Sequence, residues 1–358
     1  MEIPHSLKSC NSAQAIRANN RHFQLAASSS NSQTSGGVLL WNIPPTQGAI
    51  SRQTMFLRCR VTATCTTLPT YADADHSLGF KGPGANNASF IPSLSNGYAW
   101  IQRLTLYGTG SSVIDQMNFT NTTMDMLLAH NSNSAWLTQD GQAMLGIGRA
   151  WDPVGAQGPN VYIDLCLPLP LSCFNNSNID FNLFLCKNPL TLQLDMSSLA
   201  RALTGNAANV GITEYTVSQA YLCYEVLEVP HSLMEAERHA VQSGHPFIMP
   251  LQSWLNVQVN ESVLSSYTLG LNCSSLRSVF VTSLNAGAYA IASTIKYIRD
   301  AIDSAALGWG SGVNAQLYLD GNVKNSTIFD NPVIQYSELK QALHNNIQTS
   351  VIQPSAAT

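Results

Sequence analysis

Charged side chains are scarce in this sequence. Asp, Glu, Lys and Arg make up 11% of its 358 residues, against about 25% in an average soluble protein. The formal net charge of -4 argues against a strongly basic nucleic-acid-binding protein. A surface so poor in charge favours a protein that packs against neighbours.

Long apolar runs are missing as well. No stretch of about 18 apolar residues occurs, so the sequence predicts no membrane-spanning helix. The N-terminal residues lack the apolar segment of a signal peptide. Cys59, Cys65, Cys173 and Cys273 fall on the apolar sides of predicted strands. We therefore expect buried free thiols rather than a disulfide framework.

Motifs of known chemistry are also absent. The sequence contains no Gly-x-Ser-x-Gly, no His-Glu-x-x-His and no cysteine pair with zinc spacing. We interpret the following fragments as turns and helix ends rather than sites: Asp73-Ala74-Asp75-His76, Gly146-Ile147-Gly148, Gly308-Trp309-Gly310-Ser311-Gly312, Asp320-Gly321-Asn322, His130 and His344. The sequence predicts no catalytic, cofactor-binding or metal-binding residues, and no enzyme.

A small basic group consists of Arg52, Arg58 and Arg60. We expect these side chains to pair with acidic groups across a subunit boundary or to remain solvated. Nucleic-acid binding is disfavoured because their own strand places no aromatic side chain between them.

What the sequence has is apolar side chains that alternate with period two. The clearest case is 55–66, where Met55, Leu57, Cys59 and Val61 share one side, and such alternation predicts a half-buried strand. Eight strands are predicted, at 38–43, 55–66, 98–107, 111–117, 161–173, 179–186, 190–196 and 215–229. A short helix at 122–130 follows the fourth. This all-β order predicts a two-sheet sandwich of the jelly-roll kind.

The chain also repeats itself. Segments 63–68, 103–108 and 127–131 return in the same order at 271–276, 316–321 and 341–345, which indicates two copies of one β-rich unit. We predict an N-terminal arm (1–36), a first jelly roll (37–230), a linker helix (231–245) and a second jelly roll (246–358). The linker helix is expected to begin with a capping box formed by Ser232 and Glu235.

The second unit is short. In the first unit, half of the predicted strands follow the helix at 122–130, whereas little sequence follows the matching helix near residue 345. Half a sandwich leaves apolar strand faces in water, at a cost of about 25 cal/mol per Å². We expect a companion chain or a cleaved C-terminal fragment to complete the second jelly roll, unless the sequence itself is incomplete.

The order of these features resembles a known family. It consists of a strand ending in Asn42-Ile43-Pro44-Pro45, a long alternating strand, 101–107 before a short helix, 225–229 before the linker helix, and 250–254 opening the second unit. This order resembles the double jelly-roll major capsid proteins of tailless double-stranded DNA viruses, of the polinton-like virus and virophage type.

The resemblance implies a structural protein located in the virion. Three copies would form a pseudo-hexagonal capsomer, and capsomers would build an icosahedral shell together with penton and minor capsid proteins. The N-terminal arm would contact the genome or an inner layer weakly. The loops at 69–96, 131–160 and 285–312 are expected to build trimer contacts and the outer surface.

Two other classes remain open. A carbohydrate-binding β-sandwich or adhesin needs exposed aromatic side chains, which Trp100, Trp136, Trp151 and Trp309 can supply. A glycoside-processing enzyme needs two opposed carboxylates, and no such pairing stands out among the acidic residues.

Overall fold

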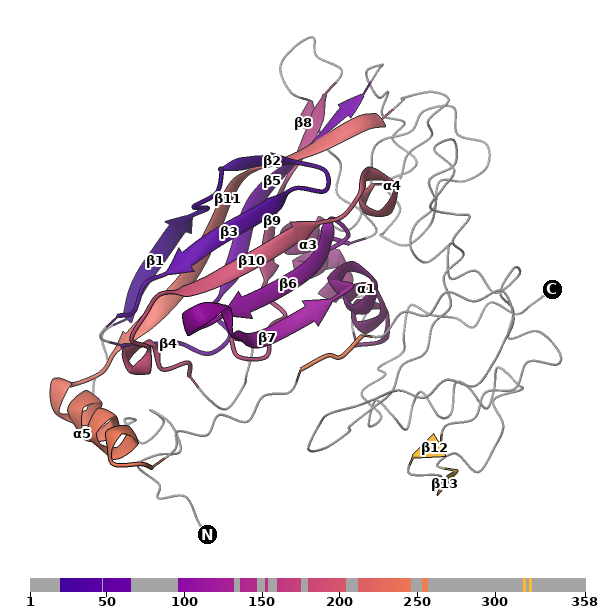
Figure 1. Ribbon diagram of the computed structural model, residues 1–358. Coiled ribbons are helices and arrows are strands. Elements are labelled where there is room, and N and C mark those ends of the chain that lie inside the picture. Colours follow the sequence, from indigo (N-terminus) through magenta and orange to yellow (C-terminus); the bar gives the residue numbers. More distant parts are fainter. Residues whose placement is uncertain are drawn as a thin grey trace.

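The computed structural model describes residues 20–46, 48–65, 96–131, 136–146, 152–153, 160–174, 180–203, 212–245, 253–256, 318–319 and 322–323. Two antiparallel β-sheets face each other (Figure 1). The larger sheet contains β1 (Asn20–Ala26), β2 (Ser32–Thr34), β4 (Gly48–Ile50), β5 (Phe56–Cys65), β8 (Asp152–Pro153), β9 (Val161–Pro168) and β11 (Ile212–Glu228). The smaller sheet contains β3 (Val38–Ile43), β6 (Ile101–Tyr107), β7 (Val113–Asn118) and β10 (Leu190–Met196).

Helical elements lie between the strands. They are η3 (Thr109–Ser111), α1 (Thr120–Asn131), η4 (Leu137–Gly141), α3 (Gln142–Leu145), η5 (Leu183–Leu185), α4 (Leu199–Ala202) and α5 (His231–Gln242). A separate hairpin pairs β12 (Tyr318–Leu319) with β13 (Asn322–Val323). No helix in the described ranges is long and apolar enough to cross a membrane.

The strand order is that of a jelly roll. The larger sheet runs β1-β11-β5-β9-β8 and the smaller β3-β10-β6-β7. The pairs are nested, because β6 pairs β7, β5 pairs β9, β3 pairs β10 and β1 pairs β11. The chain therefore forms one long antiparallel ribbon that is rolled into two layers, which confirms the predicted jelly-roll sandwich.

The core lies between the sheets and follows the predicted alternation. On β5, Leu57, Cys59, Val61 and Ala63 are buried, whereas Arg58 is exposed on the opposite side. Two hydrogen bonds connect the layers at depth. Trp41 Nε1 donates to the Ala220 carbonyl at 3.3 Å, and the Tyr215 hydroxyl donates to the Ser197 carbonyl at 2.5 Å.

Two sequence-based assignments are wrong. Residues 20–36 do not belong to an arm, because β1 pairs β11 over seven residues and β2 pairs it further along. The strand predicted at 179–186 is instead an isolated bridge between Phe181 and Ile50, followed by the 3-10 turn η5. The first sandwich still has eight principal strands, since β1 takes the place of the mispredicted segment.

The helix predicted after the first sandwich is confirmed as α5, but its capping box is not. The helix begins at His231, with Pro230 at the N-cap and no side-chain cap. Ser232 lies inside the first turn, and Glu235 contacts Arg238 instead. Most of the predicted second jelly roll lies outside the described residues, so its fold and its completion by another polypeptide stay predictions.

Candidate assembly surfaces

The edge of the smaller sheet at β3 is closed by serine side chains. The Ser28 amide and hydroxyl both donate to the Leu40 carbonyl, at 2.6 and 3.0 Å. The Ser29 hydroxyl accepts from the Leu40 amide at 3.2 Å and donates to the Val38 carbonyl at 3.4 Å. These bonds occupy backbone groups that an edge strand otherwise offers to another chain.

The opposite edge, β7, is covered by residues 253–256. The Ser253 hydroxyl lies 3.4 Å from the Gln116 carbonyl, and the Asn256 side-chain amide donates to the Asn118 carbonyl. Thr123, in α1, donates to Asn256 Oδ1 at 3.3 Å. The opening segment of the predicted second unit is therefore attached to the first sandwich.

Two large side chains in this segment have different surroundings. Trp254 packs against the main core, whereas Leu255 is 61% exposed. The segment thus packs one large apolar side chain against the sandwich and leaves the next one exposed.

Asp115 connects this segment to the sandwich. Its carboxylate is 4% exposed and accepts hydrogen bonds from the Ser253 hydroxyl (2.8 Å), the Ser172 hydroxyl (3.2 Å) and the Cys173 amide (3.3 Å). Burial raises the pKa of the Cys173 thiol well above its usual value, and the nearby Asp115 charge raises it further. The predicted buried thiols are confirmed for Cys59 and Cys173, while Cys65 and Cys273 lie outside the described side chains.

The outward face of the smaller sheet carries almost no net charge. Its middle row consists of Leu40, Gln193, Thr105 and Gln116, which are paired in register across all four strands. Gln116 Nε2 lies 3.4 Å from the Thr105 hydroxyl. In the next row Asp195 binds Arg103 Nε at 2.5 Å and Gln193 Nε2 at 2.7 Å. The cation and the anion in this row neutralise each other, so a partner can cover the face without stranding a charge.

The predicted basic group is divided between environments. Arg60 makes a two-point ion pair with Asp164 at 2.7 and 2.9 Å and lies 4.0 Å over the Tyr162 ring. Arg58 is exposed, and the Arg52 amide donates to Asp180 at 2.9 Å. Arg60 thus pairs within its own sheet rather than across a subunit boundary, whereas Arg58 is exposed, as the alternative of a solvated side chain predicts. The ring under Arg60 belongs to Tyr162 on the neighbouring strand β9. The sequence pattern of β5 alone could not predict this contact.

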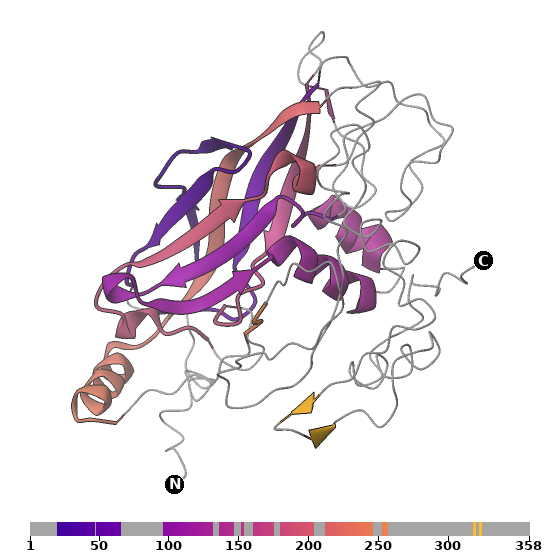
Figure 2. The same ribbon diagram turned by 45° about the vertical axis from the view of Figure 1, so that its right-hand side comes forward.

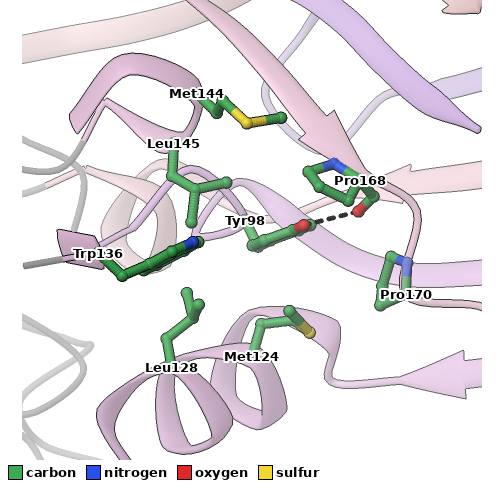
Figure 3. A pocket seen from close by; sticks show the side chains of 8 residues that line it. All are labelled: Tyr98, Met124, Leu128, Trp136, Met144, Leu145, Pro168 and Pro170. Carbon is green, nitrogen blue, oxygen red and sulfur yellow. Dashed lines mark hydrogen bonds between the residues drawn. The ribbon is translucent and has the colours of Figure 1, made fainter. Parts of the chain in front are cut away.

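A small apolar cavity of about 190 Å³ opens beside α1 (Figure 3). It is lined by Tyr98, Met124, Leu128, Trp136, Met144, Leu145, Pro168 and Pro170. Its one hydroxyl is engaged, because Tyr98 donates to the Pro168 carbonyl at 2.6 Å. Sequence reasoning missed this cavity, since its walls come from segments far apart in the chain.

The motif-like fragments fall mostly outside the described residues, including 73–76, 308–312 and His344. Gly146 ends α3 in a left-handed conformation (φ 67°), as its structural interpretation requires. His130 lies in the last turn of α1. Within the described ranges, no three His, Cys, Asp or Glu side chains gather in a way that could hold a metal ion.

The tryptophans bear on the carbohydrate alternative. Trp100 is fully buried, so it offers no surface for stacking on a sugar. Trp136 is half-buried in the cavity wall, and Trp151 and Trp309 lie outside the described residues. Neither Trp100 nor Trp136 is therefore the exposed aromatic side chain that a carbohydrate-binding surface needs.

No protein-family model and no curated protein matches the sequence. The chain is similar to the Faustovirus major capsid protein, with 9% identity over 63% of this chain and 56% of that one and a TM-score of 0.40. It is similar to the mavirus major capsid protein, with 13% identity, coverage of 65% and 53%, and a TM-score of 0.35. PBCV-1 VP54, fitted into a reconstruction of the virophage Sputnik, gives 12% identity, coverage of 62% and 45%, and a TM-score of 0.41.

The chain thus spans about half the length of the solved structures that it matches. These structures are of viral capsid proteins. The same class of protein was expected from the order of strands and helices along the sequence.

Proposed function

We propose that this chain is the major structural subunit of an icosahedral virion shell and that it associates as trimers. The observation that carries the proposal is the outward face of the smaller sheet, which is bounded by two closed edges and carries one self-neutralised ion pair. Interface cores are depleted in unpaired charge. Closed edges also prevent open-ended strand pairing between copies.

The jelly-roll fold is typical of only some classes of protein. This architecture occurs in viral capsid proteins, lectins and cupins. A cupin-like enzyme needs metal ligands inside the sandwich, but the inward side chains of β5 and β10 are apolar: Leu57, Cys59, Val61, Leu190, Leu192 and Leu194. A lectin needs exposed aromatic side chains, and Trp100 is buried. Among the described residues, these observations favour self-association over sugar binding and metal-dependent catalysis.

The proposal extends to partners. Trimers would join into hexagonal arrays with penton and minor capsid proteins, and a companion polypeptide would complete the second jelly roll. The exposed Leu255, on the segment that covers β7, supplies an apolar contact for that second unit or its partner.

Sedimentation and electron microscopy of the purified full chain test this proposal. We expect a particle of three 38.7 kDa chains that forms hexagonal arrays as its concentration rises. Gln116→Lys adds a cation to the middle row of the outward face, which contains no acidic side chain, and is expected to abolish assembly. The control, Gln24→Lys on exposed β1 of the other sheet, is expected to assemble normally.

Other outcomes contradict the proposal. A wild-type protein that remains monomeric at all concentrations and binds glycans indicates the carbohydrate-binding alternative. Equal assembly of both lysine variants, each with an intact fold by circular dichroism, excludes this face as the contact.

A further inference from the structure

Helix α5 packs on one end of the first sandwich through a small apolar cluster of its own. The cluster contains Ala49 of β4, Phe184 of η5, Val229 and Met234, with Leu185 and Leu233 packed against it. Arg238 adds polar contacts, because its Nε and Nη2 atoms donate to the Phe184 carbonyl at 3.2 and 3.1 Å. Figure 2 shows α5 beyond the β4 end of the sheets, away from α1.

A carboxyl group lies inside this contact. Glu237 follows Met234 by three residues, so both lie on the docked side of the helix, and Glu237 is only 4% exposed. Its Oε2 atom lies 3.4 Å from Asn182 Nδ2, a long hydrogen bond. Its Oε1 atom is buried and has no hydrogen-bond partner among the described residues. A buried carboxylate with one weak partner is strongly disfavoured, whereas a neutral carboxylic acid is tolerated.

No ion pair within the described ranges involves Glu237. Arg238 is engaged by the Phe184 carbonyl and by Glu235 at 3.0 Å. On the sandwich side Asp180 accepts the Arg52 amide, and β4 has no titratable residue. On α5 itself, His231 and His239 are exposed, as is Lys187 after η5. Glu228 pairs with Arg21 of β1. The Cys186 thiol donates to the Asn182 carbonyl at 4.0 Å, and burial raises its pKa.

We propose that Glu237 makes the docking of α5 pH-dependent: the protonated side chain holds the helix against the sandwich, and loss of the proton releases the helix. The device lies in the segment that joins the two predicted units. It is independent of the proposed capsid function, because it requires only the first sandwich and α5.

The direction of the effect follows from linkage. Burial raises the pKa of Glu237 from 4.5 to about 7 in the docked helix, whereas a released, solvated helix restores the ordinary value. The docked state therefore binds the proton more tightly than the released state. Docking is strongest in acid, weakens as the pH rises from 4.5 to about 7, and changes little above that range.

Hydrogen exchange of the full chain, measured by mass spectrometry and corrected for intrinsic rates, tests this device. The opening equilibrium of residues 231–242 is expected to be about tenfold larger at pH 8 than at pH 6, given a docked pKa near 7. Protection of β5 in the sandwich core serves as the internal reference and should not change. In Glu237→Gln the pH dependence of α5 should disappear.

The matched control is Glu235→Gln, which removes the other acidic residue of α5 from an exposed position. This variant should keep the tenfold change. Equal α5 protection at both pH values in the wild type overturns the proposal, as does a pH response that persists in Glu237→Gln. If β5 loses protection in Glu237→Gln, the substitution has disturbed the fold. The test then depends on the wild-type protein, whose α5 protection at pH 6 and pH 8 is compared without any substitution.

Discussion

Asp115 on β7 accepts a 2.8 Å hydrogen bond from Ser253, which lies 138 residues later in the chain. The same carboxylate holds Ser172 and the Cys173 amide. One buried side chain thus joins the edge strand, the turn after β9 and the segment that follows the linker helix. Together with the bonds of Asn256 to Asn118 and Thr123, this relationship attaches residues 253–256 to the first sandwich.

Asp115→Ala is expected to lower the free energy of unfolding by about 1 to 3 kcal/mol, because it leaves several donors in a buried site without an acceptor. Ser253→Ala removes one of those donors and should cost about 1 kcal/mol. Urea unfolding of both variants and of the double variant measures their coupling. Strictly additive losses would contradict a direct Asp115–Ser253 interaction.

Gly48 is expected to be intolerant of a side chain. A Cβ at this position would overlap the Leu227 carbonyl oxygen and lie 2.6 Å from Val226 Cγ1, so Gly48→Ala must push β4 away from β11. We expect a loss of about 3 kcal/mol in urea unfolding.

The control for this substitution is Gly110→Ala. Gly110 has φ of +68° but open space around its Cβ direction, so only backbone strain of about 1 kcal/mol applies. If Gly48→Ala and Gly110→Ala lower the free energy of unfolding equally, β4 can move away from β11 without an energetic cost.

The two ion pairs of the sheets should differ in strength. The Asp195 side chain is 18% exposed and bonds Arg103 and Gln193, whereas Asp164, paired with Arg60, is 54% exposed. We expect Asp195→Asn to cost about 1 to 3 kcal/mol and Asp164→Asn less than about 1 kcal/mol. Thermal unfolding at low and high salt separates them, since salt screens the exposed pair more. A larger loss for Asp164→Asn would reverse this ranking.

Thiol reactivity should follow exposure. Burial raises the pKa of both Cys166 and Cys223, and nearby Arg58 partly offsets that effect. Both thiols are half-buried on the outward side of the larger sheet, whereas Cys59 and Cys173 are buried. Iodoacetamide at pH 8 should therefore modify Cys166 and Cys223 before Cys59 and Cys173, which peptide mass spectrometry measures.

Removal of the nearby cation gives a second test of this assignment. Arg58→Ala should slow alkylation of Cys166 and Cys223, because less thiolate forms at a given pH. Unchanged rates would show that the guanidinium does not influence the thiols, and Cys59 provides the unreactive reference.

The alternation of apolar and polar residues predicted the central strands, which have a paired strand on each side. In β5 and β10 every second side chain is buried, so the period-two signal is strong. In β1 the sequence is mostly polar, and only Phe23 and Leu25 pack toward the core. This edge strand is defined by its pairing with β11, which lies some two hundred residues later in the chain, and no local pattern reports such a partner.

The site residues were harder to predict for the same reason. Phe181, Leu183 and Leu185 alternate as a strand does, yet a bridge to Ile50 and a tight turn place them at the end of the sandwich. Glu237 sits on the buried side of α5 together with Met234. A capping-box interpretation drew attention to Ser232 and Glu235, which are exposed. The sandwich surface that buries Glu237 becomes visible only in three dimensions.

The nested ribbon also sets an order of events during synthesis. Strand β11 pairs with β1, β2, β4 and β5, so the larger sheet lacks its central member until residues 212–228 have left the ribosome. Because each outer pair closes a longer loop than the one inside it, folding is governed by distant contacts and is slow. The nascent chain therefore exposes the apolar sides of β1 and β5 throughout that interval, which makes this half of the molecule a substrate for chaperones.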